Sequence, residues 1–398
     1  LINHADVFLN WSGNHYTPIE DGALRARMHP WLHEALRYVL NSRSKEFELQ
    51  PFEANPAAVT NVLDTLKSAT HLPADAAMPS WLDGDPQRPS PVEILPCRSS
   101  LLHLPTGRTL PLTPLYFNCN GLDYDHDPNA PEPHTWQHFL GQLFEEDYQS
   151  WDLLKEWFGY CLTGDTSQQK ILLIVGPKRS GKGTLARVLT PLVGPSNVCG
   201  PTISSLAGPF GLQPLIGKSL AIVSDARFSG KDIQTVVERM LCISGEDTLT
   251  IDRKHIPSVT MKLPTRMMFL TNELPRLTDA SGALPGRFVI IRLTRSFYGE
   301  ENTRLTDELF AELPGILNWS IDGWHRLHER GCFVQPASVE AVLQDLEDLS
   351  SPVNAFVRDR CEIDPNHRVY IDQLYHAWKN WCEADGRVSV TSKQVFGR

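Results

Sequence analysis

Four short runs of mostly apolar residues lie in the middle of the chain, and each is followed by a polar residue or glycine. The runs are Ile171–Val175, Leu220–Val223, Met267–Leu270 and Val289–Leu293. Runs of this length are typical of strands buried on both faces, as in a parallel sheet covered by helices. Helical spacing follows at Thr184–Leu189 and again at Ile233–Ile243. The pattern predicts an α/β core.

The apolar positions on either side of this core are spaced for helices and short strands. Short strands are expected near Phe8–Trp11 and a helix near Leu24–Leu40, while acidic helices are expected over Leu305–Leu346. Aromatic residues recur after Pro352. We therefore expect four parts: a helical and β region at 1–135, a core at 136–300 with a helical lead-in at 136–165, an acidic helical segment at 301–350, and a last unit at 351–398.

Composition places the chain among ordinary globular proteins, with 41% hydrophobic and 21% charged residues. No apolar run has the length of a membrane span and no signal peptide opens the chain, so we expect a cytoplasmic protein without a membrane partner. The eight cysteines are scattered without C-x-x-C spacing, which indicates reduced thiols. The first residue is Leu1 rather than Met, so we expect a fragment of a longer chain.

Charge is distributed unevenly along the chain. The net charge of −10 excludes a protein that coats nucleic acid with its whole surface. The segment from Arg253 to Arg295, however, contains eight Lys or Arg residues and only two acidic residues. An acidic body with one basic segment is typical of an enzyme that touches a polyanion at a defined place.

A glycine-rich turn joins the first apolar run to the first helix. Its pattern, G-x-x-x-x-G-K, is that of a loop whose backbone N–H groups and helix N-terminus cradle phosphate, with a lysine reaching the terminal phosphates. The expected phosphate-binding residues are Gly176, Pro177, Lys178, Arg179, Ser180, Gly181, Lys182, Gly183 and Thr184. The pattern normally continues with Ser or Thr as a magnesium ligand, but Gly183 stands there and Thr184 comes one residue late.

Polar residues follow or precede the other apolar runs. Asp225 comes two residues after the second run and is the candidate carboxylate for magnesium. Asn272 follows the third run and is placed to orient a water molecule or contact a phosphate. Arg287 precedes the fourth run, where an arginine from one subunit would reach a neighbouring subunit's phosphates. Each has a structural alternative: Asp225 and Asn272 as turn or helix caps, and Arg287 as a surface arginine.

The segment SGEDTLTIDRKHIP (244–257) predicts a hairpin with a basic tip. Arg253, Lys254 and His255 cluster there. Exposed cations on a hairpin are suited to hold a phosphate backbone without reading bases, and we expect them to bind DNA. A solvated charge cluster is the structural alternative.

Taken together, these motifs resemble the superfamily 3 helicases, and more closely the phage and plasmid primase–helicase family with a poxvirus-type helicase domain. The resemblance covers about Trp136–Phe356. The motifs that carry it are WFGYCLTGD (157–165), GPKRSGKGT (176–184), SDAR (224–227), SGED with DRKH (244–255), TNELP (271–275), DASGALPGRF (279–288) and ELPGILNW (312–319).

The resemblance implies an AAA+-like ATPase that uses ATP and Mg²⁺, assembles as a ring, with a hexamer expected, and translocates along DNA in phage, prophage or plasmid replication. Lys182 would be the phosphate lysine, Asp225 the metal-side acid, Asn272 the sensor and Arg287 the finger supplied by a neighbour. The hairpin tip would enter the central channel. Pro352–Arg398 resembles the start of a winged-helix DNA-binding domain, truncated at SKQVFGR.

The sequence departs from this family at two positions. Gly183 replaces the hydroxyl residue, so magnesium would be held by phosphates, waters, Asp225 and Thr184. Ala226 leaves the second motif with a single acid, and Glu246 or Asp247 is the candidate for the missing base. Two other functions stay open: an ATP-gated replication initiator or DNA-binding platform with weak hydrolysis, and a nucleotide kinase, since those of the adenylate kinase type also carry G-K-G-T.

Overall fold

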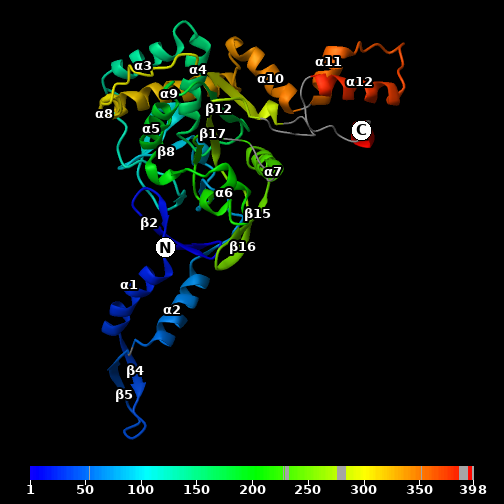
Figure 1. Cartoon of the computed structure of the whole chain (residues 1–398). Coiled ribbons are helices and arrows are strands. Elements are labelled where there is room, and N and C mark those ends of the chain that lie inside the picture. The colour runs from blue at the N-terminus through cyan, green and yellow to red at the C-terminus, as the bar shows by residue number, and fades with distance from the viewer. Residues whose placement is uncertain are drawn as a thin grey trace.

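A five-stranded parallel sheet lies at the centre of the computed structural model, which describes residues 1–52, 54–226, 228, 233–275, 284–350, 352–384 and 393–396. The structure is a mixed α/β fold with an arm near the N-terminus and a small helical unit near the C-terminus (Figure 1). Among the described residues, no helix is both long enough and apolar enough to cross a membrane.

All four predicted apolar runs are strands of this sheet. They are β12 (Ile171–Val175), β14 (Leu220–Val223), β17 (Arg266–Thr271) and β18 (Phe288–Arg292). A fifth strand, β13 (Val198–Cys199), has only two residues and gave no run to detect. The order is β13-β14-β17-β12-β18, and every neighbouring pair is parallel. All five carboxyl ends therefore lie at one edge of the sheet.

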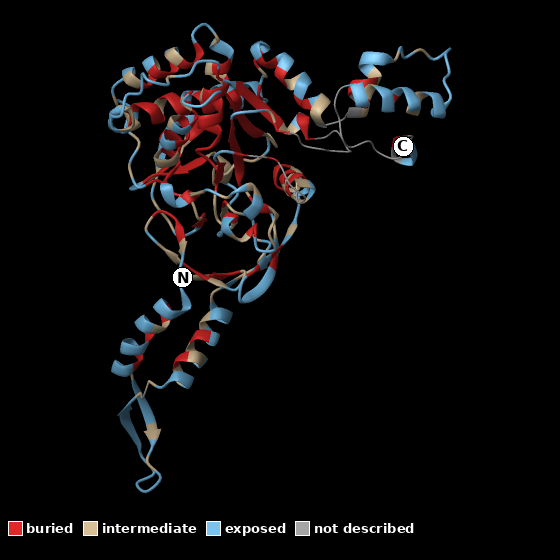
Figure 2. Ribbon diagram, in the orientation of Figure 1, coloured by how far each residue is buried: buried red, intermediate tan, exposed pale blue. Residues whose placement is uncertain are grey.

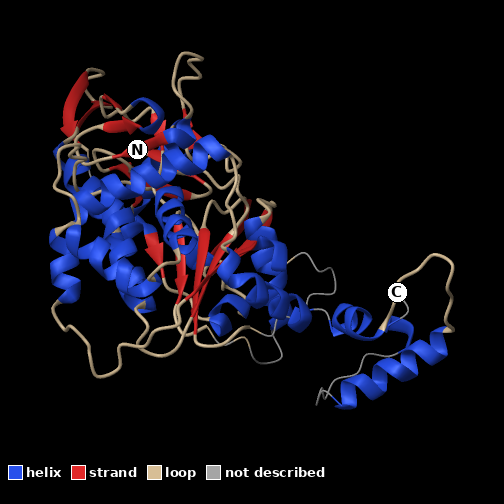
Figure 3. Cartoon of the chain, turned by 90° about the horizontal axis from the view of Figure 1, so that it is seen from above, coloured by secondary structure: helices blue, strands red, loops and turns tan. Residues whose placement is uncertain are grey.

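Both faces of the sheet are buried by helices, which explains the uninterrupted apolar runs. In β12, Leu172 and Ile174 belong to one hydrophobic cluster, whereas Ile171 and Leu173 belong to another on the opposite face. Figure 3 shows helices on both sides of the strands, and Figure 2 shows the buried residues concentrated there. The helices that contribute are α3 (His134–Phe144), α4 (Tyr148–Tyr160), α5 (Lys182–Val193), α6 (Ile203–Ala207), α7 (Ile233–Ser244), α8 (Leu305–Ala311), α9 (Leu313–Arg330) and α10 (Glu340–Ser350).

The lead-in helix α4 and the acidic helix α9 approach each other closely through glycine. A Cβ atom placed on Gly323 would lie 2.0 Å from the carbonyl oxygen of Lys155, and one on Gly159 would lie 2.3 Å from the backbone nitrogen of Trp324. The buried carboxylate of Glu156 on α4 accepts hydrogen bonds from Arg326 and Arg330 on α9. This packing fixes α9, far along the chain, against the lead-in to the sheet.

The N-terminal region forms a small sheet and an arm. The sheet has the order β3-β2-β1-β6, and the arm leaves it as helix, two-stranded ribbon and helix. These elements are β1 (Ile2–His4), β2 (Val7–Trp11), β3 (Tyr16–Pro18), α1 (Asp21–Glu34), β4 (Leu36–Leu40), β5 (Phe47–Pro51), α2 (Pro56–Ala69) and β6 (His71–Leu72). The predicted helix over 24–40 is correct as far as Glu34 but wrong at its end, because 36–40 pairs with β5 as a strand.

Short strands continue to the lead-in helix, and helices close the chain. The strands are β7 (Ser80–Trp81), β8 (Ile94–Pro96), β9 (Leu101–His103), β10 (Arg108–Leu110) and β11 (Tyr116–Phe117). The closing helices are α11 (Pro352–Arg360), α12 (Ile371–Ala384) and α13 (Lys393–Phe396). They have their own small core around Phe356 and Trp378. Residues 385–392, 397 and 398 of the expected winged-helix start lie outside the described residues.

Candidate functional site

The glycine-rich loop leaves β12 at the carboxyl edge of the sheet and enters α5. Its first residue, Gly176, donates a backbone hydrogen bond of 3.2 Å to Thr271 at the end of β17. Its last, Gly181, has φ of 89° and caps α5. A Cβ atom on Gly181 would lie 2.8 Å from a methyl group of Leu143 on α3. Only glycine satisfies both this conformation and this contact, so the tight turn follows from the sequence.

The loop presents a row of free backbone donors. Among the residues that the structure describes, none accepts a hydrogen bond from the N–H groups of 178–183. Arg179, at φ of 60°, and Gly181 place the left-handed conformation at alternate positions along this row. Such alternation turns successive N–H groups toward one point, which is the geometry of an anion-binding nest. The positive end of the α5 dipole lies at the same place.

Lys182 extends from the first position of α5 back into the loop. Its ammonium donates to the carbonyl oxygens of Gly176 at 2.6 Å and Pro177 at 2.7 Å, and to the hydroxyl of Ser180 at 3.1 Å. The side chain is buried. Burial lowers the pKa of Lys182, while the negative charge of Asp225 acts in the opposite direction. The loop therefore holds a cation inside it as well as a row of N–H groups around it.

Asp225 and Asn272 lie at the same edge as the loop. Asp225 follows β14 with φ of 50°, a conformation that Asp tolerates better than most residues, and the next residue, Ala226, donates a backbone bond to Leu270 of β17. Asn272 directly follows β17, which lies between β14 and β12. Both side chains are exposed. Parallel strand order thus brings together three predicted residues that are widely spaced in sequence.

Gly183 and Thr184 follow the lysine on the first turn of α5. A Cβ atom on Gly183 would meet only the guanidinium of Arg187, at 3.4 Å, so the position has room for a side chain. The hydroxyl of Thr184 accepts a hydrogen bond of 3.1 Å from Arg187. A role for Thr184 in binding magnesium would require it to leave Arg187.

Arg287 lies at the opposite, amino edge of the sheet. It immediately precedes β18, whose first residue is paired with the first residue of β12. Its guanidinium donates to the side chain of Gln169, in the segment that leads into β12. Five strand residues separate it from the loop of its own chain, a span of about 16 Å. It is half-buried, so part of it faces solvent.

The candidate base Glu246 lies at this amino edge as well. Its carboxylate accepts from the hydroxyl of Thr166, and the neighbouring carbonyl of Asp165 accepts from Arg266 at the start of β17. Asp247, which follows Glu246 directly, is held by a backbone bond to Cys242 in α7. The structure therefore does not bring Glu246 to the loop of its own chain, and a role for either acid as the base stays a prediction.

Two charged residues at the carboxyl edge were not identified as candidates from the sequence alone. Glu273 follows Asn272; its backbone N–H donates to the Thr271 hydroxyl and its side chain is exposed. Arg292 ends β18, is paired with Val175 just before the loop, and is exposed. Glu273 could have been found by the rule that identified Asp225 and Asn272, since it follows an apolar run, whereas Arg292 lies inside the fourth run and breaks its apolar pattern. Arg227 and residues 279–283 of the quoted motifs lie outside the described residues.

The predicted basic hairpin is present as β15 (Leu249–Arg253) and β16 (Ile256–Met261). Lys254 and His255 form its tip and are exposed. Arg253 is instead 7% exposed and donates to the carbonyl oxygens of Pro257 and of Ala5, both at 2.8 Å. Arg253 thus joins the hairpin to the N-terminal sheet, and only Lys254 and His255 are free to contact a ligand.

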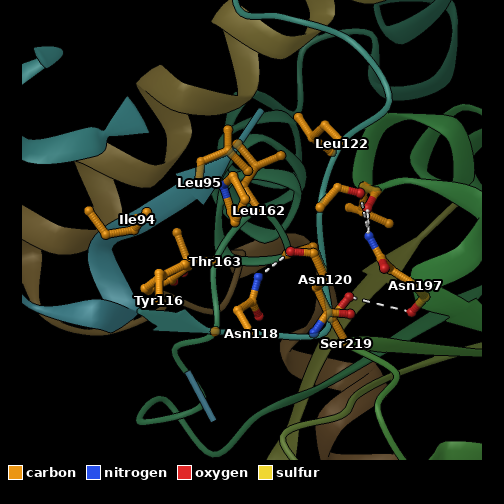
Figure 4. A pocket seen from close by; sticks show the side chains of 15 residues that line it. Ile94, Leu95, Tyr116, Asn118, Asn120, Leu122, Leu162, Thr163, Asn197 and Ser219 are labelled. Carbon is orange, nitrogen blue, oxygen red and sulfur yellow. Dashed lines mark hydrogen bonds between the residues drawn. The ribbon is translucent and has the colours of Figure 1, made fainter. Parts of the chain in front are cut away.

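A small cavity lies between the N-terminal strands β8 and β11 and the core, beside the carboxyl ends of α4 and α5 (Figure 4). Its volume of about 20 Å³ has room for one water molecule. Asn197 donates to the carbonyl oxygens of Gly121 and Val193 beside it, while the side-chain oxygen of Asn120 is buried without a partner among the described residues. We interpret this cavity as a hydration site that joins the two regions, not as a ligand site.

Comparisons with known proteins add a family and two solved structures. Residues 174–287 match the model of DUF5906, described as a family of unknown function. This segment runs from the end of β12 to Arg287 and contains Lys182, Asp225 and Asn272. The A form apo structure of the NrS-1 C-terminal region is 15% identical, with a TM-score of 0.48, covering 82% of this chain and 77% of that one.

A second structure of that region, described as the apo structure of residues 305–718, is 14% identical, with a TM-score of 0.44. It covers 92% of this chain and 90% of that one. At these values the likeness assigns neither a site nor an activity to this chain.

Proposed function

We propose that this chain binds ATP at the loop 176–184 and uses its hydrolysis to move along DNA, as one subunit of a ring that serves phage or plasmid replication. The observation that carries the proposal is the row of free N–H groups at 178–183 with the ammonium of Lys182 inside it. This combination is suited to a triphosphate, because it offers hydrogen bonds and positive charge to several oxygens at once. The choice of ATP and DNA rests on the resemblance of the linked motifs.

Each residue at the carboxyl edge has a separate role in the proposed hydrolysis of ATP. The N–H groups and Lys182 hold the β- and γ-phosphates, and Asn272 orients a water molecule toward the γ-phosphorus. We assign the base to Glu273, which takes a proton from this water as its oxygen bonds to phosphorus. The bond from the γ-phosphorus to the bridging oxygen breaks at the same time, leaving ADP and phosphate.

Asp225 fits a magnesium ion at this site. It offers an exposed carboxylate close enough to Lys182 to affect its pKa, and magnesium is commonly held by one or two carboxylates together with substrate phosphates. Among the described residues no cluster of three or more metal-ligating side chains occurs. When bound, the ion neutralises charge on the phosphates. Thr184 is the second protein candidate.

The position of Arg287 supports the proposed ring. Since it lies at the edge opposite its own loop, it reaches a triphosphate only if a neighbouring subunit presents its carboxyl edge there. Lys170 lies beside it and donates to the carbonyl oxygen of Gly286. Burial and the charge of Arg287 lower the pKa of Lys170. These two cations form a surface suited to a neighbour's phosphates, and identical subunits joined in this head-to-tail manner form a ring when the rotation between neighbours closes.

The hairpin tip is the proposed contact with DNA, and a double substitution tests it. Replacing Lys254 and His255 by alanine is expected to lower strand displacement on forked DNA at least tenfold, because the tip loses its charge–phosphate contacts. ATP hydrolysis without DNA is expected to stay unchanged, since the tip lies away from the loop. Lys262→Ala, which removes an exposed lysine at the base of the same hairpin, is the matched control. Equal displacement by the double variant and the control would contradict the role of the tip.

The same assay distinguishes the other functions that share this loop. A DNA-binding platform would bind ATP and forked DNA yet displace no strand; the single acid of the Ser224–Asp225–Ala226 segment favours it as second candidate. A nucleotide kinase would transfer the γ-phosphoryl group to a nucleoside monophosphate without any dependence on DNA. Displacement that requires ATP supports the motor, and its absence with intact ATP and DNA binding overturns it.

A further inference from the structure

The ribbon β4–β5 at the end of the N-terminal arm has one face made only of apolar side chains. Directly opposite residues of an antiparallel pair share a face. The pairs Leu36–Pro51, Tyr38–Leu49 and Leu40–Phe47 therefore lie on one side of the ribbon. Exposed fractions on this face are 59% for Leu36, 74% for Tyr38, 50% for Leu40, 68% for Phe47 and 53% for Leu49. We call these five residues the apolar face.

The other face of the ribbon is mostly polar and has partners within the arm. The guanidinium of Arg37 lies 5.5 Å from the ring centre of Phe52, and the amide of Asn41 donates to Glu48 at 2.6 Å. Gln50 is paired with Arg37 on this face. Val39, paired with Glu48, also lies on this face, so the apolar residues are concentrated on the opposite side.

Nothing in the described chain covers the apolar face. The ribbon pairs with no further strand, and the arm carries it away from the body (Figures 1 and 2). Helix α1 and a five-residue strand in line with it reach on the order of 40 Å. An isolated two-stranded ribbon is marginally stable in water, and a contiguous apolar surface of this kind marks an interaction site.

We propose that the apolar face binds the apolar face of a second copy of this chain, with the two arms meeting from opposite directions. A twofold axis across the strands then places Tyr38 over Tyr38 and Leu49 over Leu49 of the other copy. Each five-residue strand covers its equivalent along its whole length. Two such faces would remove on the order of 1,000 Å² from water, which reaches the lower bound for a specific protein interface.

Charge at the two ends of the ribbon favours this antiparallel arrangement. The turn carries Arg43 and Lys45, both exposed, while Glu46 alternates to the polar face. Exposed Glu34 ends α1 at the base of the ribbon. In the antiparallel pair the basic turn of one copy lies over the acidic base of the other, whereas parallel arms would place like charges together. An apolar surface without cations also fits a second copy better than DNA.

Crosslinking at matched positions tests the contact. Facing strands of packed sheets lie about 10 Å apart, so a short bis-maleimide links cysteines on the apolar face but not on the outer face. Leu49→Cys is expected to give a covalent dimer. Gln50→Cys, on the next residue and the opposite face, is expected to give no more dimer than the parent chain with its eight cysteines. Equal crosslinking of the two variants would overturn the proposal.

Sedimentation without nucleotide provides the second measurement. All chains carry Arg287→Ala, so that the proposed ring contact does not contribute and the outcome is independent of the proposed activity. The parent is expected to associate as a dimer, Leu49→Lys to associate at least tenfold more weakly, and Gln50→Lys to match the parent. A monomeric parent, or equal weakening by the two lysines, would contradict pairing through this face.

Discussion

Replacing Arg287 by alanine is expected to lower the rate of ATP hydrolysis roughly 10³-fold or more, the magnitude associated with an arginine that stabilises the transferred phosphoryl group. ATP binding is expected to change much less, because the arginine of a neighbour stabilises the charge of the transferring phosphoryl group more than it stabilises bound ATP. Steady-state phosphate release and equilibrium binding of ATP, measured side by side, check these two outcomes.

Mixing two inactive variants shows whether the arginine acts on a neighbouring subunit. In a mixture of Arg287→Ala and Lys182→Ala chains, one type of interface retains both residues, so activity is expected to recover. A mixture of Asp225→Ala and Lys182→Ala is the control, since both residues belong to the same pocket and every interface stays defective. Recovery in neither mixture at any ratio would contradict a shared site.

Glu273→Gln is expected to lower phosphate release by about 10²- to 10⁴-fold, the contribution of a positioned general base, and to leave ATP binding intact. The amide keeps the shape of the side chain but accepts no proton at neutral pH. Glu246→Gln is the matched control: it changes an acid at the amino edge, where the carboxylate contacts Thr166. A full rate for Glu273→Gln, or a larger loss for Glu246→Gln, would show that the base has been assigned wrongly.

The parallel sheet was predictable because its strands are buried on both faces and therefore contain few polar residues. Strand β13 was not predicted, because two residues are too few to show a hydrophobic pattern. The strand after α1 was missed although Leu36, Tyr38 and Leu40 are spaced two apart, as in a strand. These residues follow the helix almost directly, and they are exposed rather than part of a core. The same feature makes the ribbon a candidate interface.

The candidate site was predictable in its parts but not in its arrangement. The loop is local, so Gly181 and Lys182 follow from a short motif. Whether Asp225, Asn272 and Arg287 lie at the same edge depends on the direction and order of the strands. These are set by pairing between strands that are far apart in the sequence. Glu246 looked suitable in sequence because it is acidic and near the hairpin, yet it precedes a strand whereas Asp225 follows one. Arg253 looked equivalent to Lys254, but burial against Ala5 distinguishes them.

Phosphate release by the purified chain with ATP, magnesium and single-stranded DNA, measured beside Lys182→Ala, decides whether the loop 176–184 hydrolyses ATP. Lys182 supplies the only side-chain ammonium held inside the loop among the described residues. We expect steady release of phosphate by the parent chain and a fall to background in the variant. Release no greater from the parent than from Lys182→Ala would contradict this expectation.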